Sequence, residues 1–267
     1  MNKTPEEIAA LQESANVVSG VHSLLRDLIV PGAVTAKLDA LAEEYVRDHG
    51  GTPAFKGYVV GSDVPPFPST LCISVNDVVV HGFPGEEELK DGDIVTVDVG
   101  VLKNEYHGDC AFTYAVGEIS EEKQRLLDVT VESLYKGIEK AVAGNWVLDI
   151  ARAVQRHVED NGFSVVRDLV GHGIGRELHE EPSVPNFVPN PFARHRHRNQ
   201  KLSDGIVICI EPMVNAGGYK VVTDDDGWTV RTGDRKPAAH FEHMVVVREG
   251  QAQILTSHIS EPASIAA

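Results

Sequence analysis

Two aspartates in the segment 91–109 have the residue type and spacing to bind a cation. Asp98 lies in a run of mainly β-branched residues at 94–99, a composition that is typical of a β-strand. The polar residues 103–105 predict a hairpin tip, and Asp109 follows on the returning strand. Such a hairpin places the two carboxylates side by side. Carboxylates among apolar residues are costly, so the pair predicts a cation site unless one acid caps a turn and the other is solvated.

A second copy of this pattern occurs at 204–211, where Asp-Gly again precedes a β-branched run that ends in an acid. In this correspondence Asp98 matches Glu211, and Asp109 matches Glu242. The match extends upstream at nearly the same offset, where Gly32, Leu38, Val46 and Gly50 correspond to Gly144, Ile150, Val158 and Gly162. Several agreeing offsets indicate an ancient duplication rather than chance similarity. Two carboxylates from each half could therefore meet in one site.

Histidines occur in two contexts that bear on this site. The glycine-rich segment 171–179 contains His172 and His179, and its glycines allow the close backbone approach that a ligand or metal needs. The segment lacks the lysine and spacing of a phosphate-binding loop, so it does not indicate nucleotide binding. The wide, non-helical spacing of the two histidines favours separate roles in one site over a zinc-binding helix. His81 follows the apolar run 78–80, where packing is the ordinary role of a histidine.

The helices and strands that must position these residues follow from apolar periodicity and capping signals. A helix is predicted to begin at Pro5, where Thr4 can cap and Glu7 completes a capping box. A second helix is predicted from Thr35 to the glycines near residue 50. Downstream, the pattern predicts a helix from Ser120 to Gly144, another over 148–158, and strands at 71–75, 78–80, 163–166, 206–214, 241–247 and 252–255.

The composition excludes several classes of protein. The formal net charge of −16 disfavours a nucleic-acid-binding surface and fits a protein that holds cations or an amine. With 267 residues, 42% of them hydrophobic, the chain can form one large domain or two small ones. The scattered cysteines form no disulfide framework, and no segment resembles a signal peptide or a membrane span. We therefore expect a cytoplasmic protein with no DNA or membrane partner.

Taken in order, the motifs resemble those of the type I methionine aminopeptidases, which have the pita-bread metallopeptidase fold. The resemblance covers nearly the whole chain and rests on Val80-His81-Gly82, Asp98, His107-Gly108-Asp109, the glycines of 171–175, His179-Glu180-Glu181-Pro182, Ile210-Glu211-Pro212-Met213, Asp226-Gly227-Trp228 and Glu242-His243. It implies an α+β, pita-bread (creatinase/aminopeptidase-like) fold, in which pseudo-twofold duplicated helix-helix-β units surround a central antiparallel sheet. It also implies a single catalytic domain over 1–267, with pseudo-repeats at about 5–118 and 120–250 and a frayed tail at 261–267.

The resemblance implies two divalent metal ions, which would be Co, Mn, Fe or Zn. One imidazole and four carboxylates suit hard-to-borderline ions of this kind. In the family, the residues matching Asp109 and Glu242 bridge both ions. The residue matching Asp98 holds one ion, and those matching His172 and Glu211 hold the other. Each bridging carboxylate would then come from a different half, in agreement with the duplication.

The implied activity is removal of the N-terminal (initiator) methionine from peptides and nascent proteins, preferentially when the second residue is small and uncharged. A water molecule acidified by the two ions would attack the first peptide bond. Glu211 would act as the general base, and His179 would donate a hydrogen bond to the carbonyl oxygen. His81 would contact the scissile amide and assist the leaving amine.

The resemblance also implies a methionine pocket, which would be formed by Cys72, Phe67, Leu178 and Trp228. The chain departs from the family pattern in this region. Leu178 stands where an aromatic residue is usual, and Phe67 stands where tyrosine is common. The segment 59–66 carries extra residues, and the segment 183–200 is unusually long and basic. These departures leave the chemistry intact, but they bear on substrate preference.

Alternative functions fit parts of the pattern. X-Pro aminopeptidases and prolidases share the fold and the metal ligands, but they usually carry a large extra N-terminal domain. Non-catalytic binding proteins on this fold typically lose metal ligands, whereas all five expected positions are filled here. A two-metal phosphoesterase is a more distant alternative. We expect a monomer that acts on the N-terminal peptides of nascent proteins. The basic cluster at 194–198 is either a contact with ribosomal RNA or, in the favoured interpretation, a solvated loop.

Overall fold

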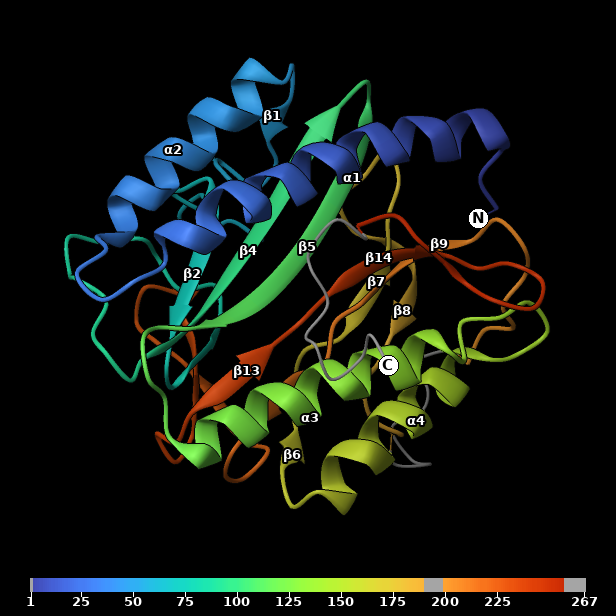
Figure 1. The fold of residues 1–267 in the computed structure, drawn as a ribbon. Coiled ribbons are helices and arrows are strands. Elements are labelled where there is room, and N and C mark those ends of the chain that lie inside the picture. Colours follow the sequence, from blue (N-terminus) through green and yellow to red (C-terminus); the bar gives the residue numbers. More distant parts are fainter. Residues whose placement is uncertain (1, 190–198, 257–267) are drawn as a thin grey trace.

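The computed structural model describes residues 2–189 and 199–256. Two helix pairs cover two groups of antiparallel strands, which is the expected duplicated arrangement (Figure 1). The basic cluster at 194–198 and the predicted frayed tail at 261–267 lie outside the described residues. No helix in the described part of the chain is long and apolar enough to cross a membrane.

The first helix pair consists of α1 (Pro5–Leu25) and α2 (Thr35–Asp48), which are joined through the 3₁₀ turn η1 (Arg26–Leu28). The predicted capping box at the start of α1 is present. The Glu7 backbone N–H donates to the Thr4 hydroxyl over 3.3 Å, and the Thr4 N–H donates to the Glu7 carboxylate over 2.8 Å. These bonds satisfy backbone donors that a helix start leaves unpaired.

The second helix pair consists of α3 (Glu121–Ile138) and α4 (Val147–Asp160). Ser120 caps α3 as predicted, because its hydroxyl accepts a backbone hydrogen bond from the first turn. The prediction that this helix continues to Gly144 is wrong. After α3 the chain turns, and the backbone N–H of Ala143 instead donates to the carbonyl oxygen of Arg248 over 3.0 Å.

The strands of the first half form a four-stranded antiparallel sheet with β4 at its centre. A long hairpin of β4 and β5 dominates this sheet, and its tip residues Asn104 and Glu105 have positive φ values of 50° and 65°. The first-half strands are β1 (Thr52–Pro53), β2 (Leu71–Val75), β3 (Val78–Val80), β4 (Ile94–Lys103) and β5 (Tyr106–Ala115). The strand β3 leaves this sheet and pairs with β12 of the second half.

The second half forms a five-stranded sheet, ordered β15-β14-β9-β7-β8, and a three-stranded sheet, ordered β13-β10-β6. Its strands are β6 (Ser164–Val165), β7 (Gly171–Gly173), β8 (Glu180–Val184), β9 (Val207–Ile210), β10 (Met213–Asn215), β11 (Val221–Thr223), β12 (Val230–Thr232), β13 (Ala238–His240), β14 (His243–Val246) and β15 (Gln253–Ile254). The strand predicted as continuous over 206–214 is interrupted at 211–212. The strand predicted over 241–247 begins only at His243, and the unpredicted strand β13 precedes it, so residues 241–242 lie between two strands. These interruptions matter for the site described below.

The packing of each helix pair repeats between the halves. The apolar faces of α1 and α2 pack on β4 and β5 through residues such as Val18, Leu38 and Val97. The faces of α3 and α4 pack on the second-half strands through residues such as Leu134 and Ile208. Glycines that correspond between the halves adopt the left-handed conformation in both copies: Gly32 and Gly144, Gly50 and Gly162, Gly92 and Gly205, and Gly117 and Gly250. This agreement of backbone geometry supports the duplication.

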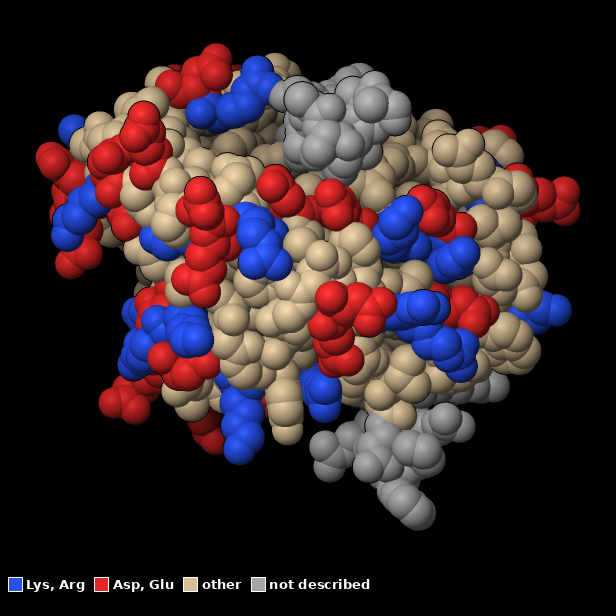
Figure 2. Space-filling view, turned by 60° about the horizontal axis from the view of Figure 1, so that its bottom comes forward, with Lys and Arg blue, Asp and Glu red and all other residues tan. Residues whose placement is uncertain are grey.

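The face that carries α3 and α4 presents acidic and basic side chains intermixed (Figure 2). On α4, Arg152 pairs with Asp149 at 2.6 Å and Arg156 pairs with Asp160 at 3.4 Å. The charge on this face is therefore mixed rather than of one sign.

Candidate active site

A cavity of about 180 Å³ is lined by residues from both halves of the chain. It contains every residue that the sequence assigned to the site: Phe67, Cys72, His81, Asp98, Asp109, His172, Leu178, His179, Glu211, Trp228 and Glu242. The remaining lining residues are mainly apolar, and the lining described by the structure includes no lysine or arginine. The acids therefore share the cavity without a basic side chain among its walls.

The first-half acids lie on the long hairpin of β4 and β5. The register pairs Asp98 with Ala111 and Asp109 with Gly100, so the two acids are diagonal neighbours on one face rather than direct partners. Both are buried, with exposed fractions of 9% and 4%. Continuous strands on both sides fix the direction of these side chains.

The second-half acids lie at strand interruptions instead. Glu211 separates β9 from β10, and Glu242 separates β13 from β14. The interruptions face each other, because Ile210 pairs with His243 on one side and Met213 pairs with His240 on the other. Because Glu242 lies outside both strands, its backbone N–H does not pair with the opposite strand and instead donates to the carbonyl oxygen of Ala111 over 2.8 Å. This bond joins the second half to β5 beside Asp109.

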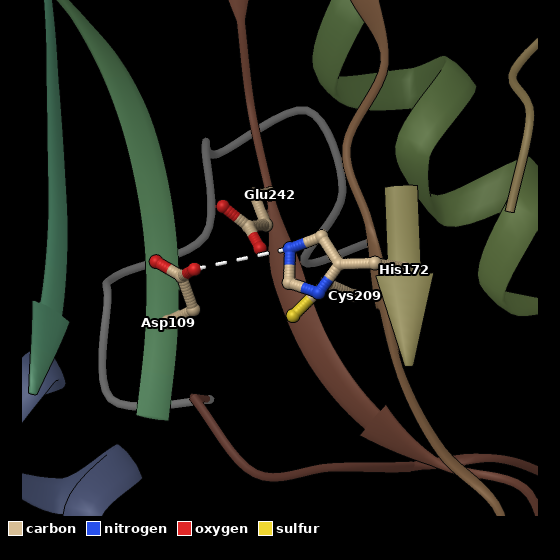
Figure 3. A group of neighbouring side chains, drawn as sticks. All are labelled: Asp109, His172, Cys209 and Glu242. Carbon is tan, nitrogen blue, oxygen red and sulfur yellow. Dashed lines mark ion pairs between the residues drawn. The ribbon is translucent and has the colours of Figure 1, made fainter. Parts of the chain in front are cut away.

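His172 on β7 completes the cluster. Its Nε2 lies 3.9 Å from Asp109 Oδ2 and 3.5 Å from Glu211 Oε1, and Figure 3 shows its ring directed toward Asp109 and Glu242. Its Nδ1 lies 2.9 Å from the carbonyl oxygen of Gly173, an acceptor that holds a proton on Nδ1. The lone pair of Nε2 is thereby directed toward the carboxylates, as a metal ligand requires.

The environment of the four carboxyl groups disfavours their charged forms. Burial raises the pKa of Asp98 to about 7. Burial, together with the charges of neighbouring acids, raises the pKa of Asp109, Glu211 and Glu242 well above the usual carboxyl range. One oxygen each of Asp98, Asp109 and Glu242 is buried without a hydrogen-bond partner among the described residues. Divalent cations would satisfy these oxygens and remove the repulsion, so the side chains fit a metal centre.

The sequence analysis missed two residues that lie next to the carboxylates, as well as Tyr58 beside His179. The sulfur of Cys209 lies with ligand atoms of Asp109, His172 and Glu242, all within 4.8 Å of one another (Figure 3). His240 lines the cavity, and its Nε2 lies 3.8 Å from Glu211 Oε2. The sequence could have indicated both residues, because each precedes an assigned glutamate by two positions. In a strand, residues two positions apart point to the same face.

The other two assigned histidines line the cavity beside the carboxylates. The ring of His179 lies 4.4 Å from the ring of His172, and its Nδ1 is 2.7 Å from the hydroxyl of Tyr58. His81 has a positive φ of 59° and lies edge-on to Trp228 at 6.1 Å. Burial lowers the pKa of His81 to about 4, and it also lowers the pKa of His179. Both rings are therefore neutral near pH 7.

The residues assigned to the methionine pocket form an apolar wall. Phe67, Cys72 and Trp228 pack together in one buried cluster, with the Phe67 and Trp228 rings edge-on at 5.2 Å. The indole N–H of Trp228 donates to the carbonyl oxygen of Pro65 over 2.7 Å, so the segment 59–66 holds this ring in place. Leu178 is also buried and lines the cavity, but it belongs to a separate cluster under α1.

Comparison with known proteins adds an independent line of evidence. The family model for "Metallopeptidase family M24" matches residues 9–249. A methionine aminopeptidase from Clostridium perfringens is 50% identical over 254 residues, which cover 95% of this chain and 97% of that protein. The crystal structure of a methionine aminopeptidase from Rickettsia prowazekii superposes with a TM-score of 0.89 at 34% identity, covering 96% of this chain and 99% of that one. A prolidase from Pyrococcus furiosus has a TM-score of 0.76 at 21% identity, with 66% of its chain covered, and this likeness concerns the fold alone.

Proposed function

The chain belongs to metallopeptidase family M24, and we propose that its cavity hydrolyses the first peptide bond of chains that begin with methionine. The observation that carries the proposal is the convergence of four carboxylates with His172 in a cavity whose other wall is apolar. Full-length relatives that are methionine aminopeptidases support the same activity. We extend the proposal to the initiator methionine of nascent proteins, with preference for a small and uncharged second residue.

In this proposal Asp98, Asp109, His172, Glu211 and Glu242 hold two divalent ions of the Co, Mn, Fe or Zn type. The unpartnered buried oxygens of three of these acids support the assignment. When bound, two such ions supply an acidified water molecule and positive charge for the substrate carbonyl. Glu211 reaches the cavity beside His172 and accepts the proton of the attacking water as general base.

In this proposal His179 donates a hydrogen bond to the substrate carbonyl oxygen. A hydroxyl group can donate to Nδ1, and Tyr58 lies 2.7 Å from that atom. In that arrangement the proton of the neutral imidazole resides on Nε2, the nitrogen left for the substrate. A donor aimed at the carbonyl oxygen stabilises the negative charge that builds there during attack. His81, on the Trp228 side of the cavity, contacts the amide that is cleaved.

The apolar wall of Phe67, Cys72 and Trp228 receives the methionine side chain. Two edge-on aromatic rings and a thiol offer a polarisable surface, and thioether sulfur packs favourably against aromatic rings. A neutral pocket of this kind rejects charged first residues, because their desolvation would be uncompensated.

A product analysis tests the proposed function. Metal-loaded protein is incubated separately with Met-Ala-Ser, Met-Lys-Ser and Ala-Pro-Ser, and the products are identified by mass spectrometry. We expect free methionine from Met-Ala-Ser, much less from Met-Lys-Ser, and an intact Ala-Pro-Ser peptide. Cleavage of the X-Pro peptide with Met-Ala-Ser left intact would assign the chain to the prolidase branch instead.

A further inference from the structure

His240 is buried without a partner for either ring nitrogen. It is 2% exposed, and neither Nδ1 nor Nε2 has a hydrogen-bond partner among the described residues. The two other buried histidines in the described chain differ in this respect. His22 contacts Tyr114 at 3.0 Å and a backbone oxygen at 3.1 Å, and His243 contacts Thr256 at 2.8 Å and Tyr135 at 3.2 Å. Burial alone therefore does not explain the unpaired ring of His240.

The backbone of His240 is held by hydrogen bonds on two sides. Its N–H donates to the Thr113 hydroxyl over 2.9 Å, and that hydroxyl donates back to the His240 carbonyl oxygen over 2.7 Å. On the other side, His240 pairs with Met213 in the ladder of β13 and β10. The ring lines the cavity with both nitrogens unsatisfied, an arrangement that is costly unless something in the cavity binds them.

The position of this ring matches that of an assigned metal ligand. Glu211 lies between two imidazoles, with Oε1 at 3.5 Å from His172 Nε2 and Oε2 at 3.8 Å from His240 Nε2. His172 Nε2 lies 3.9 Å from Asp109 Oδ2. Ligand atoms that share one ion lie about 2.0–2.2 Å from it, so any two of them are at most roughly 4 Å apart. The His240–Glu211 separation is of the same size as the separations within the assigned ligand set.

We propose that His240 is a further imidazole ligand of the metal centre, and that it binds the ion held by His172 and Glu211. This inference rests on the metal centre described under the proposed function. Its chemical consequence is a second nitrogen donor at that ion. Imidazole suits Fe, Ni, Cu and Zn, whereas carboxylate and water ligands suit Mn, and affinity for a given site rises from Mn through Fe to Co. His240 therefore biases the ion held with His172 and Glu211 against Mn²⁺ and toward the more nitrogen-preferring ions.

Metal affinity, measured without peptide turnover, tests this inference. Metal-free wild-type protein and the variants His240→Gln and His81→Gln are titrated calorimetrically with Co²⁺ and, separately, with Mn²⁺. Glutamine keeps hydrogen-bonding capacity but is a poor metal ligand, so it separates ligation from hydrogen bonding. We expect His240→Gln to weaken Co²⁺ binding by at least about tenfold and Mn²⁺ binding much less, which lowers the Co²⁺/Mn²⁺ affinity ratio. His81→Gln removes a cavity imidazole that is not a proposed ligand and should leave this ratio unchanged.

A second measurement on the wild-type protein does not depend on the folding of any variant. In Co²⁺-loaded protein, ring protons of ligating histidines show large paramagnetic shifts in the proton NMR spectrum. We expect shifted signals from two histidines, His172 and His240, and signals from a single histidine would overturn the inference. An unchanged Co²⁺/Mn²⁺ ratio in folded His240→Gln would do the same. If the metal data are as expected but no methionine is released, the proposed function fails while the ligand assignment stands.

Discussion

The hydroxyl of Tyr58 lies 2.7 Å from Nδ1 of His179. Tyr58 directly precedes the segment 59–66 and Phe67 directly follows it. The Phe67 N–H donates to the Tyr58 carbonyl oxygen over 2.9 Å, and this bond joins the two ends of the segment. The far side of the segment is tied to Trp228 through the carbonyl oxygen of Pro65. One segment thus connects the group that orients His179 with the wall of the proposed methionine pocket.

Replacement of His179 with alanine should lower kcat by on the order of 100-fold, the scale of one lost donor to a developing oxyanion. KM should change much less, because the donor acts mainly on charge that appears in the transition state. Steady-state kinetics with Met-Ala-Ser provide the measurement. An unchanged kcat in a folded variant would remove His179 from this role.

The Tyr58→Phe variant should show a smaller loss of kcat, about tenfold, because the ring of His179 stays in place while its tautomer is no longer held. Tyr219→Phe is the matched control, since Tyr219 is 39% exposed and stacks on Arg167 outside the cavity. Its kcat should equal that of the wild-type protein. A Tyr58→Phe variant with full activity would show that the hydroxyl does not set the tautomer.

Glu242→Ala removes a proposed bridging ligand and should abolish turnover even at saturating metal concentration. Metal analysis of the purified variant should also show a lower metal content than the wild-type protein, because one proposed bridge between the ions is lost. Glu249 is exposed in the same half of the chain, so Glu249→Ala is the control for loss of an acid. This variant should retain both the wild-type turnover and the wild-type metal content. Normal activity in metal-replete Glu242→Ala would refute the ligand assignment.

The metal-free protein should lose stability as the pH rises from about 6.5 to 8. The pKa of Asp98 is raised to about 7, and those of Asp109, Glu211 and Glu242 are also raised well above the usual range. The folded chain therefore holds protons that the unfolded chain has already released, so the free energy of unfolding falls as pH rises. Buried histidines have lowered pKa values and act in the opposite sense, but only below about pH 6.5, where the unfolded chain still binds protons at histidine.

Bound metal should reverse this trend, since the ligands must be deprotonated to bind it. Thermal unfolding midpoints with EDTA and with saturating Co²⁺, compared across the same pH range, provide the test. The increase in midpoint caused by Co²⁺ should grow with pH. A metal-free midpoint that rises between pH 6.5 and 8 would contradict the raised carboxyl pKa values.

The helix starts and the acids of the site could be predicted because each depends on local residue types. Thr4 and Glu7 form their capping box within one turn, and Asp98 and Asp109 lie in a hairpin whose tip is visible in the sequence. The resemblance placed His172 with these acids, although no local pattern predicts contact between residues so far apart in the chain. The end of α3 was missed because a tertiary hydrogen bond to the Arg248 backbone, absent from local propensity, competes with the helix.

The strand interruptions at Glu211 and Glu242 are the part of the site that pattern alone did not reveal. Apolar residues flank both glutamates, so residues 206–214 were predicted as one strand and Glu242 was placed inside a strand that begins at Phe241. Pro212 was a usable signal, because proline cannot donate to a strand ladder. No equivalent residue marks the interruption at Glu242. Its existence follows from pairing with the opposite interruption and from the bond to Ala111, which are properties of the folded chain.

Leu178 should make the first-residue preference of this protein broader than an aromatic residue at the same position would. It is 4% exposed and lines the cavity, but it offers no ring to a thioether. A sulfur–aromatic contact contributes about 0.3–1.5 kcal/mol, which corresponds to roughly a two- to tenfold preference for methionine over leucine or norleucine. Leu178→Phe should raise the ratio of kcat/KM for Met-Ala-Ser to that for the norleucine and leucine analogues by this factor. Leu178→Met, which conserves volume without adding a ring, should leave the ratio near the wild-type value. Equal ratios in Leu178→Phe and the wild-type protein, with unchanged thermal stability, would show that the methionine side chain does not contact position 178.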